Sequence, residues 1–291
     1  MTTAVYSSSA QGAVARIIPD ILRHRGLLRD LISKDLRARY RNAMAGFLWA
    51  VLQPLLFTLI LAFVFTVVFQ VGGRGGIRQS ALEILSKLIF WQFFATALAA
   101  AANSLIDNRD LVKKVQFPRE LIPLAAIANA LVNLAIGFGV LLIVQTVMAG
   151  PPPPIAILVL PFILAVELAL VCGLGLLVAA ANVHFRDTAY LLEILLTFGF
   201  YASPVLYPMA WVGPRFAEIP AIRDAGLGAW LEAIYALNPM AGLLTASSDL
   251  ILDGRLPSAA LLASPTLWAI AALLIGGCVF RRLSPLFADH L

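Results

Sequence analysis

Long apolar runs separated by short polar segments make up most of the chain. A helix that crosses a bilayer needs about 20 consecutive, mostly apolar residues. Six runs approach or exceed this length: about 47–69, 88–106, 121–149, 155–182, 190–207 and 259–280. The pattern therefore predicts an all-α polytopic membrane protein with six transmembrane helices, preceded by an N-terminal segment (1–46) and followed by a short tail (283–291).

Residues 26–41, GLLRDLISKDLRARYR, follow a different period. Turning the chain by about 100° per residue places the leucines and Ile32 on one half of a helix and most charged residues on the other. Such an amphipathic helix lies on the membrane surface rather than across it. Two interpretations of its arginines stay open: they contact anionic lipid headgroups, or they present an anionic substrate.

The composition agrees with a membrane protein. Of the residues, 61% are hydrophobic and 13% are charged, whereas soluble domains contain about 25% charged residues. Placing the N-terminus inside assigns 15 of the 21 Lys and Arg residues to the inner side, in agreement with the positive-inside rule. We therefore expect both termini in the cytoplasm, and we attribute the net charge of +5 to topology rather than to nucleic-acid binding. Residues 1–46 show no cleavable signal peptide, so the first span is expected to direct insertion.

Two common catalytic chemistries lack their residues. His24, His184 and His290 are expected to be distant from one another, and none has the His or Cys neighbours of a metal site. The sequence contains no Gly-Lys dipeptide, so the phosphate-binding loop of an ATPase is absent. We expect no metal site and no cofactor in this chain; ATP with Mg²⁺ would bind to a partner subunit.

Two carboxylates, Glu167 and Glu193, lie inside the predicted spans. An ionisable residue in a span is a functional candidate by default, because its burial costs several kcal/mol unless it is paired or hydrated. A proton relay is one interpretation, although a relay usually needs a longer series of such groups. Glu193 is also close to the predicted inner surface, where it could reach water or Arg186. The role of both residues stays open.

Three stretches carry a resemblance to a known family: RYRNAMAGFLWAVLQPLL (39–56), LVKKVQFPRELIPLA (111–125), and FRDTAYLLEILLTFGFYASPVLYP (185–208) with LNP (237–239). They resemble the ABC-2 type permeases that export bacterial surface polysaccharides such as O-antigen and teichoic acid. The resemblance spans about residues 26–282. It implies a homodimer in the bacterial cytoplasmic (inner) membrane, a separate nucleotide-binding ATPase subunit, and a lipid-linked polysaccharide as substrate.

The resemblance implies a role for the charged segment 107–120, DNRDLVKKVQFPRE. In the family this segment docks into the ATPase and couples ATP-driven closure to movement of the spans. The sequence suits that role, because a short helix here would have an apolar side, including Val115, and a charged rim. A loop that only sets topology would need no apolar side. The candidate coupling residues, of which Asp107 or Asn108 can cap the helix, are Asp107, Asn108, Arg109, Leu111, Val112, Lys113, Lys114, Phe117, Arg119 and Glu120.

The region 208–258 is long for a loop and mixes apolar stretches with Gly, Pro and Trp. The resemblance implies that it forms short re-entrant helices, lining the exit between spans five and six. Aromatic residues are also expected at the outer ends of spans two and five. They form either an interfacial belt or flat faces along which sugar rings slide. The candidates for this sugar channel are Trp91, Phe93, Phe94, Phe198, Tyr201 and Tyr207.

Three arginines of the N-terminal helix, Arg37, Arg39 and Arg41, are candidate contacts for a substrate pyrophosphate, because guanidinium groups match phosphate oxygens. We therefore expect the permease subunit of an exporter for a lipid-linked polysaccharide, without enzymatic activity of its own.

Two alternatives stay open. One is an ABC-2 exporter of a small hydrophobic drug or lipid. The other is a membrane glycosyltransferase, which would need clustered carboxylates at a membrane face. Asp107, Asp110 and Asp187 are too few and too separated in sequence to support it.

Overall fold

The computed structural model describes residues 19, 23–40, 46–64, 76–115 and 117–291, and these residues form helices and turns without a β-strand. The N-terminal helix is α2 (Arg25–Tyr40). The long helices among the described residues are α3 (Gly46–Phe63), α4 (Gly76–Asp107), α6 (Leu121–Ala149), α7 (Pro154–His184) and α13 (Ala259–Leu283). The shorter ones are α5 (Arg109–Lys114), α8 (Thr188–Ala202), η2 (Met209–Trp211), α9 (Val212–Glu218), α10 (Pro220–Asp224), α11 (Gly228–Ala236), α12 (Pro239–Asp253), η3 (Ser284–Leu286) and α14 (Phe287–His290).

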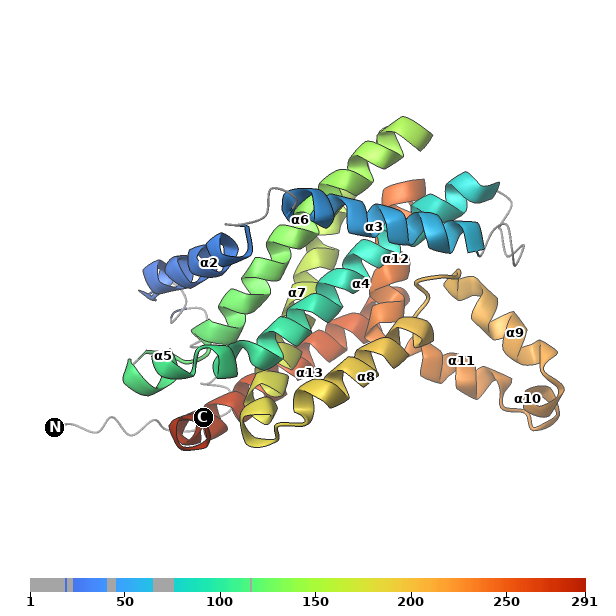
Figure 1. Cartoon of the computed structure of the whole chain (residues 1–291). Coiled ribbons are helices and arrows are strands. Elements are labelled where there is room, and N and C mark those ends of the chain that lie inside the picture. The colour runs from blue at the N-terminus through green and yellow to red at the C-terminus, as the bar shows by residue number, and fades with distance from the viewer. Residues whose placement is uncertain (1–18, 20–22, 41–45, 65–75, 116) are drawn as a thin grey trace.

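The centre of the molecule is a bundle of α4, α6, α7 and α13, with α12 inserted beside it (Figure 1). Apolar side chains from these helices form one large core, in which Phe90, Leu170 and Leu244 are fully buried. Helices α7 and α13 approach each other most closely at Gly173 and Gly276, where a Cβ on either residue would overlap backbone atoms of the other helix. Their packing therefore depends on direct contact between the two backbones.

Within the part of the chain that the structure describes, four helices, α4, α6, α7 and α13, are long and apolar enough to cross a membrane. They agree with four of the predicted runs, and α6 has the predicted boundaries. The predicted span 190–207 corresponds to α8, which has 15 residues and ends at Ala202. At about 1.5 Å per residue it is shorter than the roughly 30 Å hydrocarbon core. The predicted first span, 47–69, begins as α3, but residues 65–75 lie outside the described part of the chain.

Helix α4 begins at Gly76, twelve positions before the predicted start of the second span at residue 88. The predicted run leaves Glu83 and Lys87 outside the second span. In the structure these two residues are one helical turn apart and form an ion pair, so the helix continues through them. The helix is therefore longer than the predicted run, and the boundary of the membrane crossing stays a prediction.

Helix α2 packs against α6 through the buried Leu31. Part of its polar side also faces the protein: Asn129 Nδ2 of α6 donates to Asp35 Oδ2 at 3.2 Å. Lys34 Nζ donates to Asn108 Oδ1, just before α5, at 3.1 Å. The amphipathic helix predicted from the sequence is present, but part of its polar side contacts other helices of the protein instead of lipid headgroups or substrate.

The region between α8 and α13 is helical, and its two halves differ in burial. Helix α12 lies in the core and begins at the sequence LNP. Asn238 is its N-cap, because the Asn238 side chain accepts a hydrogen bond from Met240 N, and Pro239 occupies the first turn. Gly254, with φ of 68°, ends it in the left-handed conformation. Helices α9, α10 and α11 have no buried residue and form an arm at the opposite end of the bundle from α5 (Figure 1).

Candidate functional site

A second, smaller apolar core lies at the end of the bundle that carries α5, which we call the α5 end. Nearly every helix that reaches this end contributes to it: the buried side chains are Leu105, Val112, Ile122, Leu176, Ala179, Ala180, Val183, Phe280 and Phe287. The rings of Phe280 and Phe287 meet edge to face, with centroids 5.2 Å apart. This small core joins α5 and α14 to the ends of α4, α6, α7 and α13.

Helix α5 is the predicted coupling helix, and its orientation differs from the prediction. Its apolar side was expected to face a partner, yet Val112 is only 2% exposed and packs in the small core with Leu111 and Phe117 at its edge. Val115, just after the helix, is 47% exposed. The reason for the difference is α14, whose Phe287 occupies the space beside Val112. Position 116 lies outside the described residues.

The predicted cap is present by position only. Asn108 is the N-cap of α5 but makes no side-chain capping hydrogen bond. Its amide group instead donates to Ser104 O at 2.9 Å and its oxygen accepts from Lys34 of α2. Asn108 therefore connects the start of α5 to α4 and α2. Asp107 is exposed.

Two residues expected in the charged rim, Arg119 and Glu120, contact the last long helix instead. Arg281 Nε of α13 donates to Glu120 Oε1 at 2.9 Å. Arg119 Nη1 donates to the backbone carbonyl of Ser284, directly after α13. The charges that remain exposed for a partner are those of Asp107, Arg109, Asp110, Lys113 and Lys114.

The candidate pyrophosphate contacts are only partly covered by the structure. Arg37 is exposed near the end of α2. Nothing is described of the Arg39 side chain, and Arg41 lies outside the described residues. The structure therefore places one of the three guanidinium groups at a surface and leaves their convergence as a prediction.

The aromatic candidates separate into two groups, of which the first lies on α4. Trp91, Phe93 and Phe94 are buried in the large core at the middle of α4, because this helix begins at Gly76. Trp91 packs against Phe94 and against Phe200 of α8, with ring centroids 5.5 and 5.9 Å apart. These three rings therefore line no surface in this conformation, and their expected location at the outer end of a span stays a prediction.

The second aromatic group lies on and after α8. Phe198 and Tyr201 are 70% and 66% exposed. Tyr207 is partly buried, and its hydroxyl donates to Tyr201 O at 3.1 Å and accepts from Tyr235 Oη at 3.2 Å. Phe198 and Tyr201 are therefore the two candidates that keep a ring available to a ligand, a second copy or lipid.

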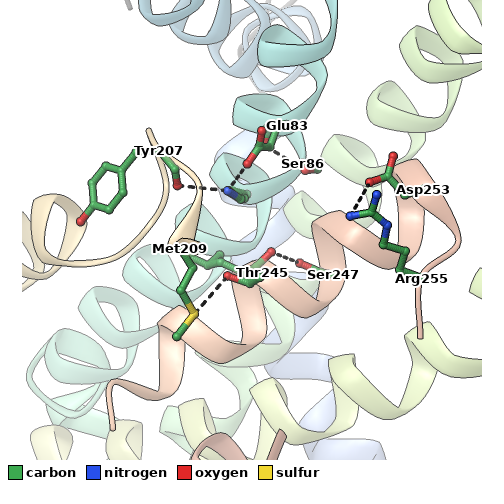
Figure 2. Close-up of polar contacts among 10 residues, drawn as sticks. Glu83, Ser86, Tyr207, Met209, Thr245, Ser247, Asp253 and Arg255 are labelled. Atoms are coloured by element: carbon green, nitrogen blue, oxygen red, sulfur yellow. Dashed lines mark hydrogen bonds and ion pairs between the residues drawn. The ribbon is translucent and has the colours of Figure 1, made fainter. Parts of the chain in front are cut away.

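The end of the bundle opposite α5 contains a charged residue that the sequence interpretation missed. Lys87 of α4 is 2% exposed, and its ammonium group contacts Glu83 and donates to the backbone carbonyl of Tyr207 at 3.2 Å (Figure 2). This carbonyl belongs to the turn between α8 and η2. The spacing of Glu83 and Lys87 by four residues was the signal that could have revealed a paired, buried charge.

The same network includes acidic residues of α12. Burial raises the pKa of Asp249 above its usual range, Lys87 acts in the opposite direction, and Asp253 and Glu83 raise it further. Asp253 also contacts Arg255, with Oδ2 and Nη1 3.7 Å apart (Figure 2). Lys87 is thus a buried cation that connects α4 to the turn at Tyr207 and acts electrostatically on the acidic residues of α12.

The structure also places the two glutamates of the predicted spans and two of the histidines. Glu167 is fully buried in α7, and neither carboxylate oxygen has a hydrogen-bond partner among the residues that the structure describes. Glu193 is exposed on α8. The expectation that the histidines are distant is wrong for one pair: His184 and His290 stack with ring centroids 4.7 Å apart, because α14 packs against the end of α7.

Comparison with known proteins places this arrangement among membrane transporters. The profile of the ABC-2 type transporter family matches residues 27–251. The chain is 29% identical to the O-antigen export system permease protein RfbA of Myxococcus xanthus over 276 residues, covering 95% of this chain and 99% of that protein. It is 27% identical to a protein of the same name from Klebsiella pneumoniae over 270 residues, covering 91% and 96% of the two chains.

Proposed function

The chain belongs to the ABC-2 type transporter family, and we propose that it is the permease subunit of an exporter that moves a lipid-linked polysaccharide across the bacterial cytoplasmic membrane. The observation that carries this proposal is similarity over nearly the full length of two chains named as O-antigen export permeases. Because this chain and those relatives align almost from end to end, their named function is a reasonable premise for the whole chain.

The helices support a multi-pass arrangement. Four of them meet the length and composition of a span. We propose that α3 and α8 complete six crossings, with the turn at Ser203–Pro208 and the arm α9–α11 forming the re-entrant outer part. In this orientation the α5 end lies in the cytoplasm, and so do both termini, in agreement with the positive-inside rule.

The exposed part of α5 provides the site for an ATPase subunit. Arg109, Lys113 and Lys114 are exposed on this helix, and Val115 adds an exposed apolar side chain beside them. A small apolar contact surrounded by charges is the usual composition of a transient protein interface. In this proposal ATP and Mg²⁺ bind to the partner, and the permease works as a homodimer around the polysaccharide.

The route of the substrate follows from the groups that stay accessible. Arg37 is exposed on α2, at the same end of the molecule as α5. Together with Arg39 and Arg41 it would bind the pyrophosphate of the lipid carrier before transport. Phe198 and Tyr201 would then offer flat faces to sugar rings along α8.

Two valine-to-aspartate variants test the docking surface. Val115→Asp places a charge on the exposed position, so we expect the purified permease to fold normally. Its affinity for the ATPase subunit should fall by about tenfold or more, which corresponds to about 1.4 kcal/mol of binding free energy. Val112→Asp is the matched control, because it places the same charge in the small core. It should lower the yield of folded permease even when the permease is expressed alone.

The measurement is co-purification with the partner ATPase subunit, together with size-exclusion profiles of the permease alone. Normal ATPase capture by the Val115→Asp variant would remove this surface from the interface. Transfer of sugars by the purified permease without the ATPase would contradict the transporter proposal as a whole.

A further inference from the structure

Helix α5 is connected to the membrane-crossing helices by more than the chain itself. The chain joins it to α4 and α6, which are its neighbours in sequence. Glu120 and Arg119, which follow α5, contact Arg281 and the carbonyl of Ser284 at the end of α13. Phe287 of α14 adds an apolar contact in the small core. The α5 end of the bundle therefore contains a second connection, to a helix more than 130 residues further along the chain.

The ion pair of this connection is well protected from water. The side chains of Arg281 and Glu120 are 22% and 14% exposed, whereas the Lys114–Asp110 pair within α5 is 75% and 78% exposed. Exposed pairs contribute little because water and salt screen them. A largely buried pair is strongly coupled, and removing one partner is costly because it leaves the other charge poorly solvated.

The position of the pair matters because the direct route from α5 to α6 is not helical. Residues 117–120 form a turn, and α6 begins only at Leu121. A turn changes shape more easily than a helix, so it would absorb part of any displacement of α5. Arg119 and Glu120 lie in this turn and are held to α13, so a displacement of the turn has to move α13 as well.

Helix α13 can carry such a displacement into the bundle. It packs along α7 with direct backbone contact at Gly173 and Gly276, where no side chain separates the two helices. Close-packed helices shift as units because packed interiors have low compressibility.

We propose that Glu120–Arg281 and Arg119–Ser284 form a strut, the α5–α13 strut, through which movement of the coupling helix is transmitted to α13 and α7. The inference rests on the proposed function, since it needs an ATPase that moves α5. It assigns Glu120 and Arg281 as positioning residues for transport rather than as contacts of the ATPase.

A double-mutant cycle with a matched control tests the strut. The variants are Glu120→Gln, Arg281→Gln and both together, and the control is Arg282→Gln, the same change at the exposed neighbouring arginine. Each is reconstituted as the permease–ATPase complex in vesicles. The readout is polymer exported per ATP hydrolysed, normalised to intact complex.

We expect each single variant to reduce export per ATP at least fivefold while complex yield and ATP hydrolysis stay within twofold of the wild type. The double variant should be no worse than either single one, because both changes break the same contact. The Arg282→Gln control should match the wild type.

Three results would overturn the strut: a wild-type ratio in the single variants, a loss of complex with an unchanged ratio, or single effects that multiply in the double variant. The second result would identify the contact as a structural brace. Failure of the proposed function gives a different result, since the unmodified complex would then export no polymer in response to ATP.

Discussion

Replacing Lys87 by Met tests whether the buried network opposite α5 stabilises the fold. The substitution keeps a long, flexible, largely apolar side chain and removes the ammonium group. In the structure this group contacts Glu83 and donates to the carbonyl of Tyr207. The variant therefore loses one ion pair and one charged hydrogen bond without creating a large cavity.

The magnitude follows from the exposure of the two partners. A hydrogen bond with a charged group contributes about 1.5–3 kcal/mol, and the Tyr207 carbonyl loses its ammonium donor. The Glu83 side chain is 31% exposed, so water can solvate the carboxylate that remains, which keeps the loss well below the roughly 3–5 kcal/mol of a fully buried pair. We expect a loss of about 2 kcal/mol. For a chain of this size that corresponds to a fall of about 3 °C in Tm.

The assay is thermal unfolding of the purified chain in detergent, followed by intrinsic tryptophan fluorescence. Lys114→Met is the matched control, because Lys114 also pairs with an acidic residue four positions earlier but is 75% exposed. Exposed helical pairs contribute about 0.3–0.5 kcal/mol, so this variant should unfold within about 1 °C of the wild type. Equal changes in Tm for the two variants would refute the reasoning that burial makes Lys87 important.

Three further predictions concern packing, pH and the aromatic residues. Gly276→Ala should destabilise the chain by about 1–3 kcal/mol, because the added Cβ would overlap the backbone of α7. At Gly139 the added Cβ would meet no neighbouring atom of the described residues within 4 Å, so Gly139→Ala should be neutral or stabilising. Denaturant unfolding would measure both, and equal effects would contradict the packing argument. Because burial raises the pKa of Asp249 above 3.8, the folded chain keeps a proton that the unfolded chain has released, so its contribution to stability should fall as pH rises from about 4 towards the raised pKa. Asp249→Asn should lack this fall when unfolding free energies are compared across that range, and parallel pH profiles would exclude the effect. Phe198→Ala should lower polymer export per folded permease with little change in stability. Trp91→Ala should destabilise the fold by about 3–5 kcal/mol, which lowers the folded yield, and should leave export per folded permease unchanged. Surface polymer normalised to folded protein separates the two outcomes, and unchanged export for Phe198→Ala would leave only the interfacial-belt interpretation.

The apolar runs predicted the long helices because membrane-length hydrophobic segments leave few alternatives. For α6, α7 and α13 the length of the run alone was sufficient, and their boundaries agree within three residues. The same method failed where charge and burial coincide. It began the second span at residue 88 and left Lys87 outside it, and the sequence alone did not show that Glu83 and the Tyr207 carbonyl satisfy this lysine.

The coupling segment illustrates a different limit. The pattern of residues 107–120 correctly indicates a short helix with an apolar side. It does not indicate what covers that side, because the answer depends on where Phe287 lies after the whole bundle has formed. The same holds for Arg119 and Glu120, which have the composition of an interface rim and in fact contact α13.

Apolar and polar contacts therefore specify different properties of this bundle. Hydrophobic burial is non-directional and determines that the helices associate. Where apolar side chains of similar size follow each other along a helix, burial fixes the axial position of that helix against its neighbour only weakly. Two of the directional contacts lie near the two ends: Lys87 joins α4 to the turn at Tyr207, and Arg281 joins α13 to Glu120. Each of these two connects a long helix to a turn, whereas Asn182 Nδ2 of α7 donates to Ala102 O of α4 at 2.8 Å and joins two long helices directly. A change at either turn consequently acts on one particular helix, and residues that are far apart in the sequence decide which one it is.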